Sequence, residues 1–444
     1  MCANSEQRRE RTPLARSREL QERAAAVIPY ASQTGSKRLA QFVQGISPSH
    51  IERAAGARLW DPDGNEYIDC NASLGPIILG HNHPAVRAAV SDQLEDGTVF
   101  TMEHPLQVGV AEAVTEMVPC AEMVKFAKNG NDVTTLAAKL ARASTGRNVI
   151  ATQGYHGWTD TWTCANQRIA AGIPDKLAAY TKPFEYNDIE SVEEIFANHP
   201  DDVAAILTNP VNNEPPEDGF LEDLRDLAHD HGALLVFDEV LTGFQAAPGG
   251  AQERFDVIPD LACFAKAMAN GYPFSALAGR REVMRHMEAD DFSYSMTNAG
   301  EAASLAAAAA TLEILREEPV HDHIREHGRR LREGYNDLAA EHGLETMTEA
   351  SGFDERFSIG FDVAESDGPV RSLFMQAAHS RGVLFTGSHM PTYSHTDVDI
   401  DRTLAVYDDC LNEVKTALDA GDVADRPRGD PIGSTLRQRW EEPA

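Results

Sequence analysis

The strongest constraint on the fold is a series of short segments, apolar almost throughout, that alternate with helical patterns. The apolar segments occupy residues 148–153, 203–208, 233–240 and 261–266. The helical patterns between them occupy residues 133–145 and 221–232. Continuously apolar strands are typical of parallel sheets, because helices cover both faces of such sheets. The pattern predicts an α/β fold with a mostly parallel central sheet flanked by helices.

The remainder of the chain predicts a second, smaller domain. Residues 1–84 hold two short strands around a Pro-Asp-Gly turn, and we expect them to contribute to the small lobe and to the active site. Residues 85–318 are predicted to form the large α/β domain. Residues 319–424 combine an amphipathic helix with an alternating strand at 356–363, which indicates a small α+β domain. Residues 425–444 are rich in charge, proline and glycine, as in a loose tail.

The net charge of −31 at pH 7 bears on the partners of the protein. Such a field repels phosphate, so we expect neither nucleic acid nor an anionic membrane as a partner. The basic residues comprise 8 lysines and 31 arginines. An acidic, lysine-poor surface fits a protein that works in high salt, although a GC-rich codon bias would give the same composition.

The cysteines and the hydropathy indicate a compartment. The six cysteines are Cys2, Cys70, Cys120, Cys164, Cys263 and Cys410. Their spacing contains no CxxC pair, which favours reduced structural thiols and gives no metal site. The N-terminus lacks the apolar core of a signal peptide, and no apolar run approaches the ~20 residues of a membrane span. We therefore expect a cytoplasmic protein.

Two chemically reactive side chains stand at the ends of predicted strands. Asp238 ends the apolar part of one strand, and Lys266 ends another. Taken alone, each has an ordinary reading as a loop carboxylate or a surface lysine. Ligands of open α/β sheets, however, bind beyond the carboxyl ends of the strands. A desolvated lysine in that place loses its proton readily and can form a Schiff base.

Two further motifs fit a phosphorylated aromatic ligand. Asn-Gly-Asn-Asp at 129–132 opens a helix, whose free N–H groups and positive dipole end suit a phosphate, although plain helix capping would need the same residues. Tyr155 lies between glycines after a strand, where its ring could cover a ligand or simply pack in the turn. An amine, a carboxylate, a phosphate seat and a stacking ring together match the needs of pyridoxal phosphate.

The chain resembles the class III, fold-type I aminotransferases that depend on pyridoxal phosphate, and most closely their branch with glutamate-1-semialdehyde aminomutase. Seven motifs occur in the order of that family. They are GARLWDPDGNEYIDC (56–70), GPIILGHNHPAV (75–86), LARASTGR (140–147), GYHGWTD (154–160), VFDEVLTGF (236–244), GGAQERFDVIPDLACFAKAMANGYP (249–273) and SHTDVDIDRTL (394–404).

The resemblance implies a role for each matching residue. Lys266 would form the internal aldimine and shuttle a proton, and Asp238 would bind the pyridine nitrogen. The further cofactor contacts would be Gly130 and Asn131 at the phosphate, Tyr155 and Val240 on the two ring faces, and Thr297. This threonine matches one that reaches the phosphate of the neighbouring subunit, which implies a homodimer with active sites at the interface.

The sequence departs from the family mainly where substrate would bind. Glu214 stands where aminomutases of this family have asparagine and many ω-amino-acid aminotransferases have glutamate. Arg38 and Ser73, in the N-terminal segment, are the other candidates for substrate contact. The phosphate turn reads Asn-Gly-Asn, where the family usually has Ser-Gly-Ser or Ser-Gly-Thr.

These observations predict an aminotransferase that moves an amino group from an amino acid or amine to an aldehyde or keto acceptor. An intramolecular aminomutase of the glutamate-1-semialdehyde type is the alternative within the family. A non-catalytic homologue that binds the cofactor, and a phosphate-binding enzyme that uses Lys266 as a plain base, are the alternatives outside it. The motifs also permit a sugar-like or β-amino substrate.

Overall fold

The computed structural model describes residues 12–166, 169–212, 214–363, 367–430 and 432. Contacts group these residues into two compact units. The large unit is Ala72–Glu326, and the small unit joins the described residues up to Asn71 with those from His327 onward. The domain limits expected at residues 84, 318 and 424 remain predictions.

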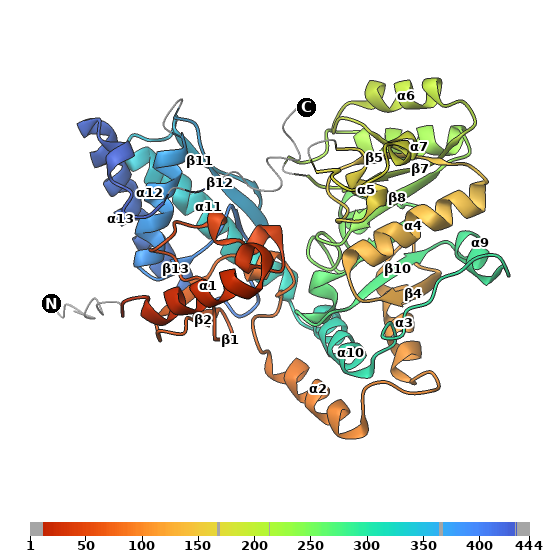
Figure 1. Cartoon of the computed structure of the whole chain (residues 1–444), viewed down its shortest axis with the longest axis horizontal. Helices are drawn as coiled ribbons and strands as arrows, with labels where there is room; N and C mark the ends of the chain where they lie inside the picture. The colour runs from red at the N-terminus through yellow and green to blue at the C-terminus, as the bar shows by residue number, and fades with distance from the viewer. Residues whose placement is uncertain (1–11, 167–168, 213, 364–366, 431, 433–444) are drawn as a thin grey trace. The chain divides into compact units, whose positions relative to one another are not determined.

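The large unit contains a seven-stranded sheet in the order β4-β10-β9-β8-β7-β5-β6 (Figure 1). Its strands are β4 (Met123–Ala127), β5 (Val149–Gln153), β6 (Thr181–Pro183), β7 (Val203–Thr208), β8 (Leu234–Glu239), β9 (Leu261–Phe264) and β10 (Ser275–Gly279). The pairs β6-β5, β5-β7, β7-β8 and β8-β9 are parallel, and β10 is antiparallel to both of its neighbours. The expected mostly parallel sheet is confirmed.

Helices pack on this sheet and extend beyond it. The helices of the large unit are α2 (Pro84–Asp96), α3 (Leu106–Met117), α4 (Gly130–Thr145), α5 (Asp160–Thr163), α6 (Ile189–Asn198), α7 (Phe220–Asp230), α8 (Ala251–Phe255), α9 (Arg281–Met284) and α10 (Ala302–Glu317). Helix α4 buries Val133, Leu136 and Leu140 against the sheet. It ends at Gly146, whose φ of +70° suits a residue without a Cβ.

The small unit contains two sheets. Strands β1 (Arg53–Ala55), β2 (Arg58–Trp60), β3 (Glu66–Asp69) and β13 (Val383–Leu384) form the first, in that order. Strands β11 (Thr348–Phe353), β12 (Arg356–Phe361) and β14 (Ser388–His389) form the second. Val383 pairs in parallel with Ile68, so the N-terminal strands share a sheet with a strand from the C-terminal part of the chain.

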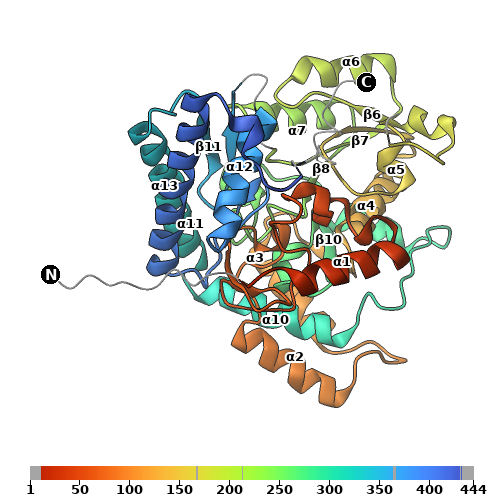
Figure 2. The same cartoon turned by 60° about the vertical axis from the view of Figure 1, so that its left-hand side comes forward.

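Helices complete the small unit and supply most of its core. They are α1 (Ala15–Val27), α11 (Val320–Glu341, which begins in the large unit), α12 (Asp367–Ser380) and α13 (Asp397–Ala420). Figure 2 shows α11, α12 and α13 side by side with β11. Tyr335 of α11 meets the rings of Phe374 and Tyr407 edge to face, each at 5.8 Å between ring centroids.

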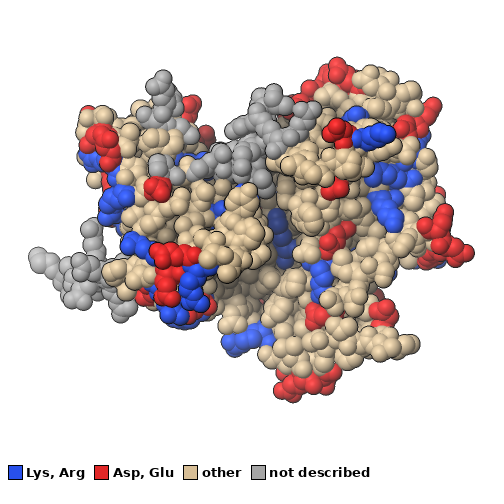
Figure 3. Space-filling model, viewed as in Figure 1, with Lys and Arg blue, Asp and Glu red and all other residues tan. Residues whose placement is uncertain are grey.

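The surface carries the charge that the composition predicts. Figure 3 shows Asp and Glu side chains gathered over α6 and over the end of α2, with Lys and Arg interspersed elsewhere on that face. Within the described ranges, no helix combines the length and the apolar character that crossing a bilayer requires.

Candidate active site

The carboxyl ends of the parallel strands place the predicted reactive residues at one edge of the sheet. Asp238 of β8 pairs in register with Cys263 of β9, three residues before Lys266. Ala127, the last residue of β4, pairs with Ser275 of β10, so the turn after β4 lies at the same edge. Ligands of open α/β sheets bind at this edge.

Lys266 has a backbone conformation that is uncommon for lysine. The strand expected at 261–266 ends at Phe264, because Lys266 takes φ of +47° and starts the short 3-10 helix η6 (Lys266–Ala269). This left-handed conformation costs a non-glycine residue about 1–2 kcal/mol and is concentrated at functional sites. Lys266 is half-buried, whereas Ala265 before it and Ala267 after it are buried. The turn therefore lifts the lysine out of the core.

Asp238 is buried and bound to a histidine. Its Oδ2 lies 2.7 Å from Nδ1 of His156, and its Oδ1 accepts the backbone N–H of Val240 at 3.0 Å. The side chains of His156 and Asp238 are 1% and 3% exposed. His156 follows β5, and its ring reaches past β7 to β8, because β7 lies between those strands in the sheet.

Both ring nitrogens of His156 face a hydrogen-bond acceptor. Its Nε2 lies 2.9 Å from the carbonyl oxygen of Gln153, and its Nδ1 lies 2.7 Å from Oδ2 of Asp238. The two contacts fix the imidazole ring and, through it, the orientation of the Asp238 carboxylate at the base of the site.

The turn at the start of α4 has the features of a phosphate seat. The first N–H groups of a helix have no partner within it, and the positive end of the dipole lies there. An alanine Cβ at Gly130 would lie 2.7 Å from Cγ1 of Val240, so only glycine fits this approach. The described residues offer no hydrogen-bond partner to the buried Oδ1 of Asn131. Rotating that amide would present its NH₂ group to a phosphate oxygen.

Two further predicted cofactor residues also lie in the large unit. Tyr155 is 47% exposed in the turn after β5. Gly157 in the same turn packs closely on Asn131: a Cβ added at Gly157 would lie only 2.8 Å from Oδ1 of Asn131. Thr297 is exposed in a segment that precedes α10.

The three substrate candidates differ in their placement. Ser73 lies in the large unit, within a run of four consecutive residues with positive φ, from Ala72 to Gly75. Glu214 is exposed on the loop after β7. Arg38 belongs to the small unit, where its guanidinium lies 3.6 Å from the centroid of the Tyr30 ring. The described contacts do not bring Glu214 to Lys266 or Asp238.

His156 is the site residue that the sequence analysis missed. It lies within the motif GYHGW, in which only Tyr155 was assigned a role. The role of His156 could be recognised only once the order of the strands was known. Its partner Asp238 lies 82 residues later in the sequence, on a strand that β7 separates from β5.

The arrangement fits pyridoxal phosphate. A half-buried lysine, a buried carboxylate, and a helix start with free N–H groups meet the requirements of its aldehyde, ring nitrogen and phosphate. Comparison with known proteins decides the family, because residues 43–417 match the model of the family described as Aminotransferase class-III. The chain belongs to the class III aminotransferases.

Proteins of established name resemble this aminotransferase along most of its length. The glutamate-1-semialdehyde 2,1-aminomutase of Syntrophobacter fumaroxidans is 37% identical over 398 residues, covering 84% of this chain and 92% of the relative. The 3-aminobutyryl-CoA aminotransferase of Cloacimonas acidaminovorans is 34% identical, covering 92% of this chain and 100% of the relative. The solved structure of the FumI protein of Sphingopyxis sp. MTA144, in its PLP internal aldimine form, superimposes with a TM-score of 0.85 at 31% identity, covering 91% of this chain and 98% of that protein.

These comparisons confirm the fold, the family and the cofactor. The protein is a fold-type I, pyridoxal-phosphate-dependent enzyme of the aminotransferase class, as the sequence predicts.

Proposed function

We propose that this enzyme moves an amino group from an amino acid or amine to an external aldehyde or keto acid, with Lys266 as its reactive amine. The observation that carries the proposal is the placement of Lys266 and Asp238 at the ends of the neighbouring strands β9 and β8, at the sheet edge that also carries the turn at Gly130. Bound pyridoxal phosphate supplies an aldehyde and an electron-withdrawing ring.

Each residue then has a defined task. Nζ of Lys266 holds the cofactor between turnovers, removes a proton from the substrate carbon that bears the amino group, and delivers a proton during transfer. Asp238 accepts a hydrogen bond from the ring nitrogen, and His156 keeps Asp238 in place. Gly130 and Asn131 hold the phosphate, whereas Tyr155 and Val240 cover the ring.

A spectroscopic experiment tests the role of Lys266. The purified enzyme is expected to show the visible absorption band of a lysine-bound pyridoxal, and Lys266→Ala to lose both that band and amino transfer. The matched control is Lys182→Ala, because Lys182 lies on β6 at the far edge of the sheet. An unchanged spectrum in Lys266→Ala would contradict the proposal.

The intramolecular aminomutase is the second candidate, because relatives at 35% to 37% identity carry that name. Single turnover separates the two functions. A panel of amino donors should convert the cofactor to a stable amine form and release the keto acid or aldehyde that corresponds to each donor, and a second keto acid or aldehyde should regenerate it. Conversion of glutamate-1-semialdehyde without release of any keto acid would favour the aminomutase.

Ser73 is the substrate candidate that the large unit supports best. The segment after it is tied to the loop that follows Lys266: the N–H of Leu79 donates to Oδ1 of Asn270 at 3.0 Å. The nearby Gly80 accepts from the other end of the same amide at 2.9 Å. We infer that Ser73 contacts substrate, whereas Arg38 and Glu214 remain candidates from the sequence. Ser73→Ala should raise KM for the donor more than it lowers kcat.

We further propose a homodimer in which Thr297 reaches the phosphate of the neighbouring subunit. The exposure of Thr297 supports this, and so does an apolar surface beside its segment. The N–H of Ala302 donates to the carbonyl oxygen of Thr98 at 2.8 Å. The residues that follow Thr98 include four exposed apolar side chains, which are Val99, Phe100, Met102 and Val108. Such a surface is typical of subunit contacts.

We place the protein in the cytoplasm on the strength of its cysteines. Five cysteines lie within the described ranges, and all five are buried, unbridged thiols. Burial raises the pKa of Cys70 to about 12, which leaves its thiol protonated and unreactive. Buried thiols that form no bridges fit a reducing compartment.

A further inference from the structure

The segment that carries Thr297 is held in place by an unusual share of the lysines. Residues 292–301 form no regular helix or strand. Of the eight lysines in the chain, Lys125, Lys128 and Lys139 all contact this segment or its end. Nζ of Lys125 lies 5.7 Å from the centroid of the Tyr294 ring, and Nζ of Lys139 bonds the carbonyl oxygen of Ser293.

All three lysines come from β4, from α4 or from the turn between them. Lys125 lies in β4, Lys139 lies in α4, and Lys128 lies between them, directly before Asn129. The hydroxyl of Tyr294 adds a bond to the carbonyl oxygen of Phe126 in β4, at 2.9 Å. The segment before α10 is thus fixed to the β4–α4 connection at several points.

Lys128 makes the strongest of these connections. Its Nζ donates to Oε2 of Glu301 at 3.0 Å and to Oγ of Ser304 at 3.0 Å. The Lys128 and Glu301 side chains are 14% and 18% exposed, so solvent screens the pair little. Removing one partner of such a pair leaves the other charge buried and uncompensated.

Glu301 is also fixed on its other side. It caps α10, since its carboxylate accepts the N–H groups of Ala303 at 2.8 Å and Ser304 at 3.1 Å. Burial opposes the charged form of Glu301, but the hydrogen bonds from Ser304, Lys128 and Ala303 outweigh it and lower the pKa of this carboxyl. Glu301 therefore stays ionised and keeps its bond to Lys128 at neutral pH.

We propose that Lys128 is a positioning residue whose ion pair with Glu301 fixes Thr297 relative to the phosphate turn, so that affinity for the phosphate of the cofactor depends on this pair. The inference rests on the proposed function and on the dimer. One end of the pair adjoins Gly130, which serves its own subunit, and the other end lies four residues after Thr297, which serves the neighbouring one. The pair thus connects the phosphate turn of one active site with the threonine that we propose to serve the other active site of the dimer.

The test compares two ligands that differ only in the phosphate. Full-length protein is stripped of cofactor and titrated with pyridoxal phosphate and, separately, with pyridoxal. Lys128→Met is expected to weaken the binding of pyridoxal phosphate about tenfold, as for other residues that act through a network, and to leave the binding of pyridoxal unchanged. Glu301→Gln should have the same effect, because it removes the charge but keeps an oxygen for the cap of α10.

Further variants decide whether the effect belongs to the pair. Combining Lys128→Met with Glu301→Gln should weaken binding no more than either change alone, and Lys128→Arg should restore it. The control is Lys415→Met, which breaks an exposed lysine–aspartate pair in α13. If Lys128→Met bound pyridoxal phosphate and pyridoxal with equally reduced affinity, or bound both with normal affinity, the proposal would be overturned. If the unmodified protein gave no lysine-bound spectrum at all, the proposed function would fail instead.

Discussion

At the scale of single residues, the contact between His156 and Asp238 is the feature with the largest chemical consequence. His156 holds the carboxylate in the orientation in which we propose that it meets the ring nitrogen, so loss of the histidine would let the carboxylate turn away. Hydrogen bonds to charged groups contribute about 1.5–3 kcal/mol. We therefore expect His156→Asn to slow the single-turnover half-reaction about tenfold to a hundredfold.

The measurement is the rate of that half-reaction at a saturating concentration of amino donor. His156→Asn should lower the rate, whereas His286→Asn, which changes an exposed histidine in the same unit, should not. A His156→Asn enzyme with the normal rate would show that the contact with Asp238 has no part in the reaction.

The sequence is informative about which reactive side chains share an edge of the sheet and less so about their partners. Lys266 and Asp238 could be placed at one edge because each ends a predicted apolar strand, whereas the role expected of Gly130 rests on the predicted helix start and on the family resemblance. The partner of Asp238 could not be predicted, since a histidine in a turn has many possible neighbours until the strand order is known. The pairing of Lys128 with Glu301 spans 173 residues and is equally hidden in the sequence.

At the scale of elements, the start of α4 depends on the absence of a side chain at Gly130. Gly130→Ala would place a Cβ 2.7 Å from Val240, which is closer than carbon atoms normally approach. We expect this variant to bind pyridoxal phosphate at least about tenfold more weakly, because the turn must shift to relieve a clash with a branched, half-buried side chain.

The control for this prediction is Gly109→Ala in α3. Gly109 also lies in a helix of the large unit, but a Cβ there meets no atom within 4 Å. Gly109→Ala should leave cofactor affinity unchanged and slightly raise the melting temperature, because alanine favours helix over glycine. Normal cofactor affinity in Gly130→Ala would show that the turn tolerates a wider approach.

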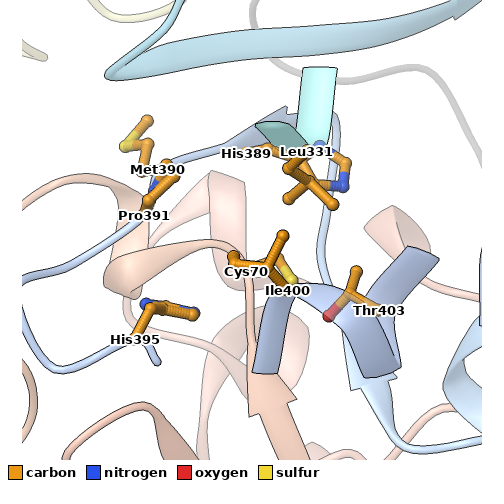
Figure 4. A pocket seen from close by; sticks show the side chains of 8 residues that line it. All are labelled: Cys70, Leu331, His389, Met390, Pro391, His395, Ile400 and Thr403. Atoms are coloured by element: carbon orange, nitrogen blue, oxygen red, sulfur yellow. The ribbon is translucent and has the colours of Figure 1, made fainter. Parts of the chain in front are cut away.

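A second element-scale prediction concerns two histidines in the core of the small unit. His389 and His395 line a gap that is too small for a water molecule, beside Cys70, Ile400 and others (Figure 4). Burial lowers the pKa of His389 to about 3 and that of His395 to about 4. In an unfolded chain both would titrate near 6.5, and each pKa unit of difference corresponds to about 1.4 kcal/mol.

The sign of the effect follows from these depressed pKa values. The folded state resists protonation, so the stability that these histidines give is complete above about pH 6.5 and is lost progressively as the pH falls toward 4. Thermal unfolding followed between pH 7 and pH 4 should show this decline. His389 stacks on Phe357 at 5.0 Å between centroids, so His389→Phe should keep this stacking and reduce the decline, while lowering stability at every pH because it removes the hydrogen bond to the Tyr407 hydroxyl. If the stability of His389→Phe fell as steeply between pH 7 and pH 4 as that of the unmodified protein, other titrating groups would be responsible for the loss.

Four of the seven strands of the large sheet correspond to apolar segments indicated by the sequence, whereas β4, β6 and β10 were not predicted. The apolar segments at 148–153, 203–208 and 233–240 match β5, β7 and β8 to within one residue at either end. The segment at 261–266 does not, because the left-handed turn at Lys266 ends the strand two residues early. The hydrophobic pattern indicates where a strand passes through the core, but it does not indicate a left-handed turn such as the one at Lys266.

At the scale of the whole molecule, the apolar surface beside Thr297 predicts the behaviour of the protein in solution. Met102 is 80% exposed. If this surface lies in a subunit contact, Met102→Glu buries a charge there and should convert dimer to monomer by sedimentation, with loss of cofactor affinity. Val398→Glu is the control, since Val398 in α13 is 70% exposed and lies in the small unit. An unmodified protein that sediments as a monomer would contradict the dimer.

The pairing of Val383 with Ile68 has a consequence for the order in which the protein is made. As the ribosome extends the chain, strands β2 and β3 emerge early but lack their neighbour β13 until residue 383 has left the exit tunnel. All of Ala72–Glu326 is synthesised in that interval and can fold first, because domains fold as units during synthesis. One edge of the N-terminal strands therefore stays unpaired during most of synthesis. A chaperone that binds unpaired strand edges is expected to bind this protein during translation rather than after its release.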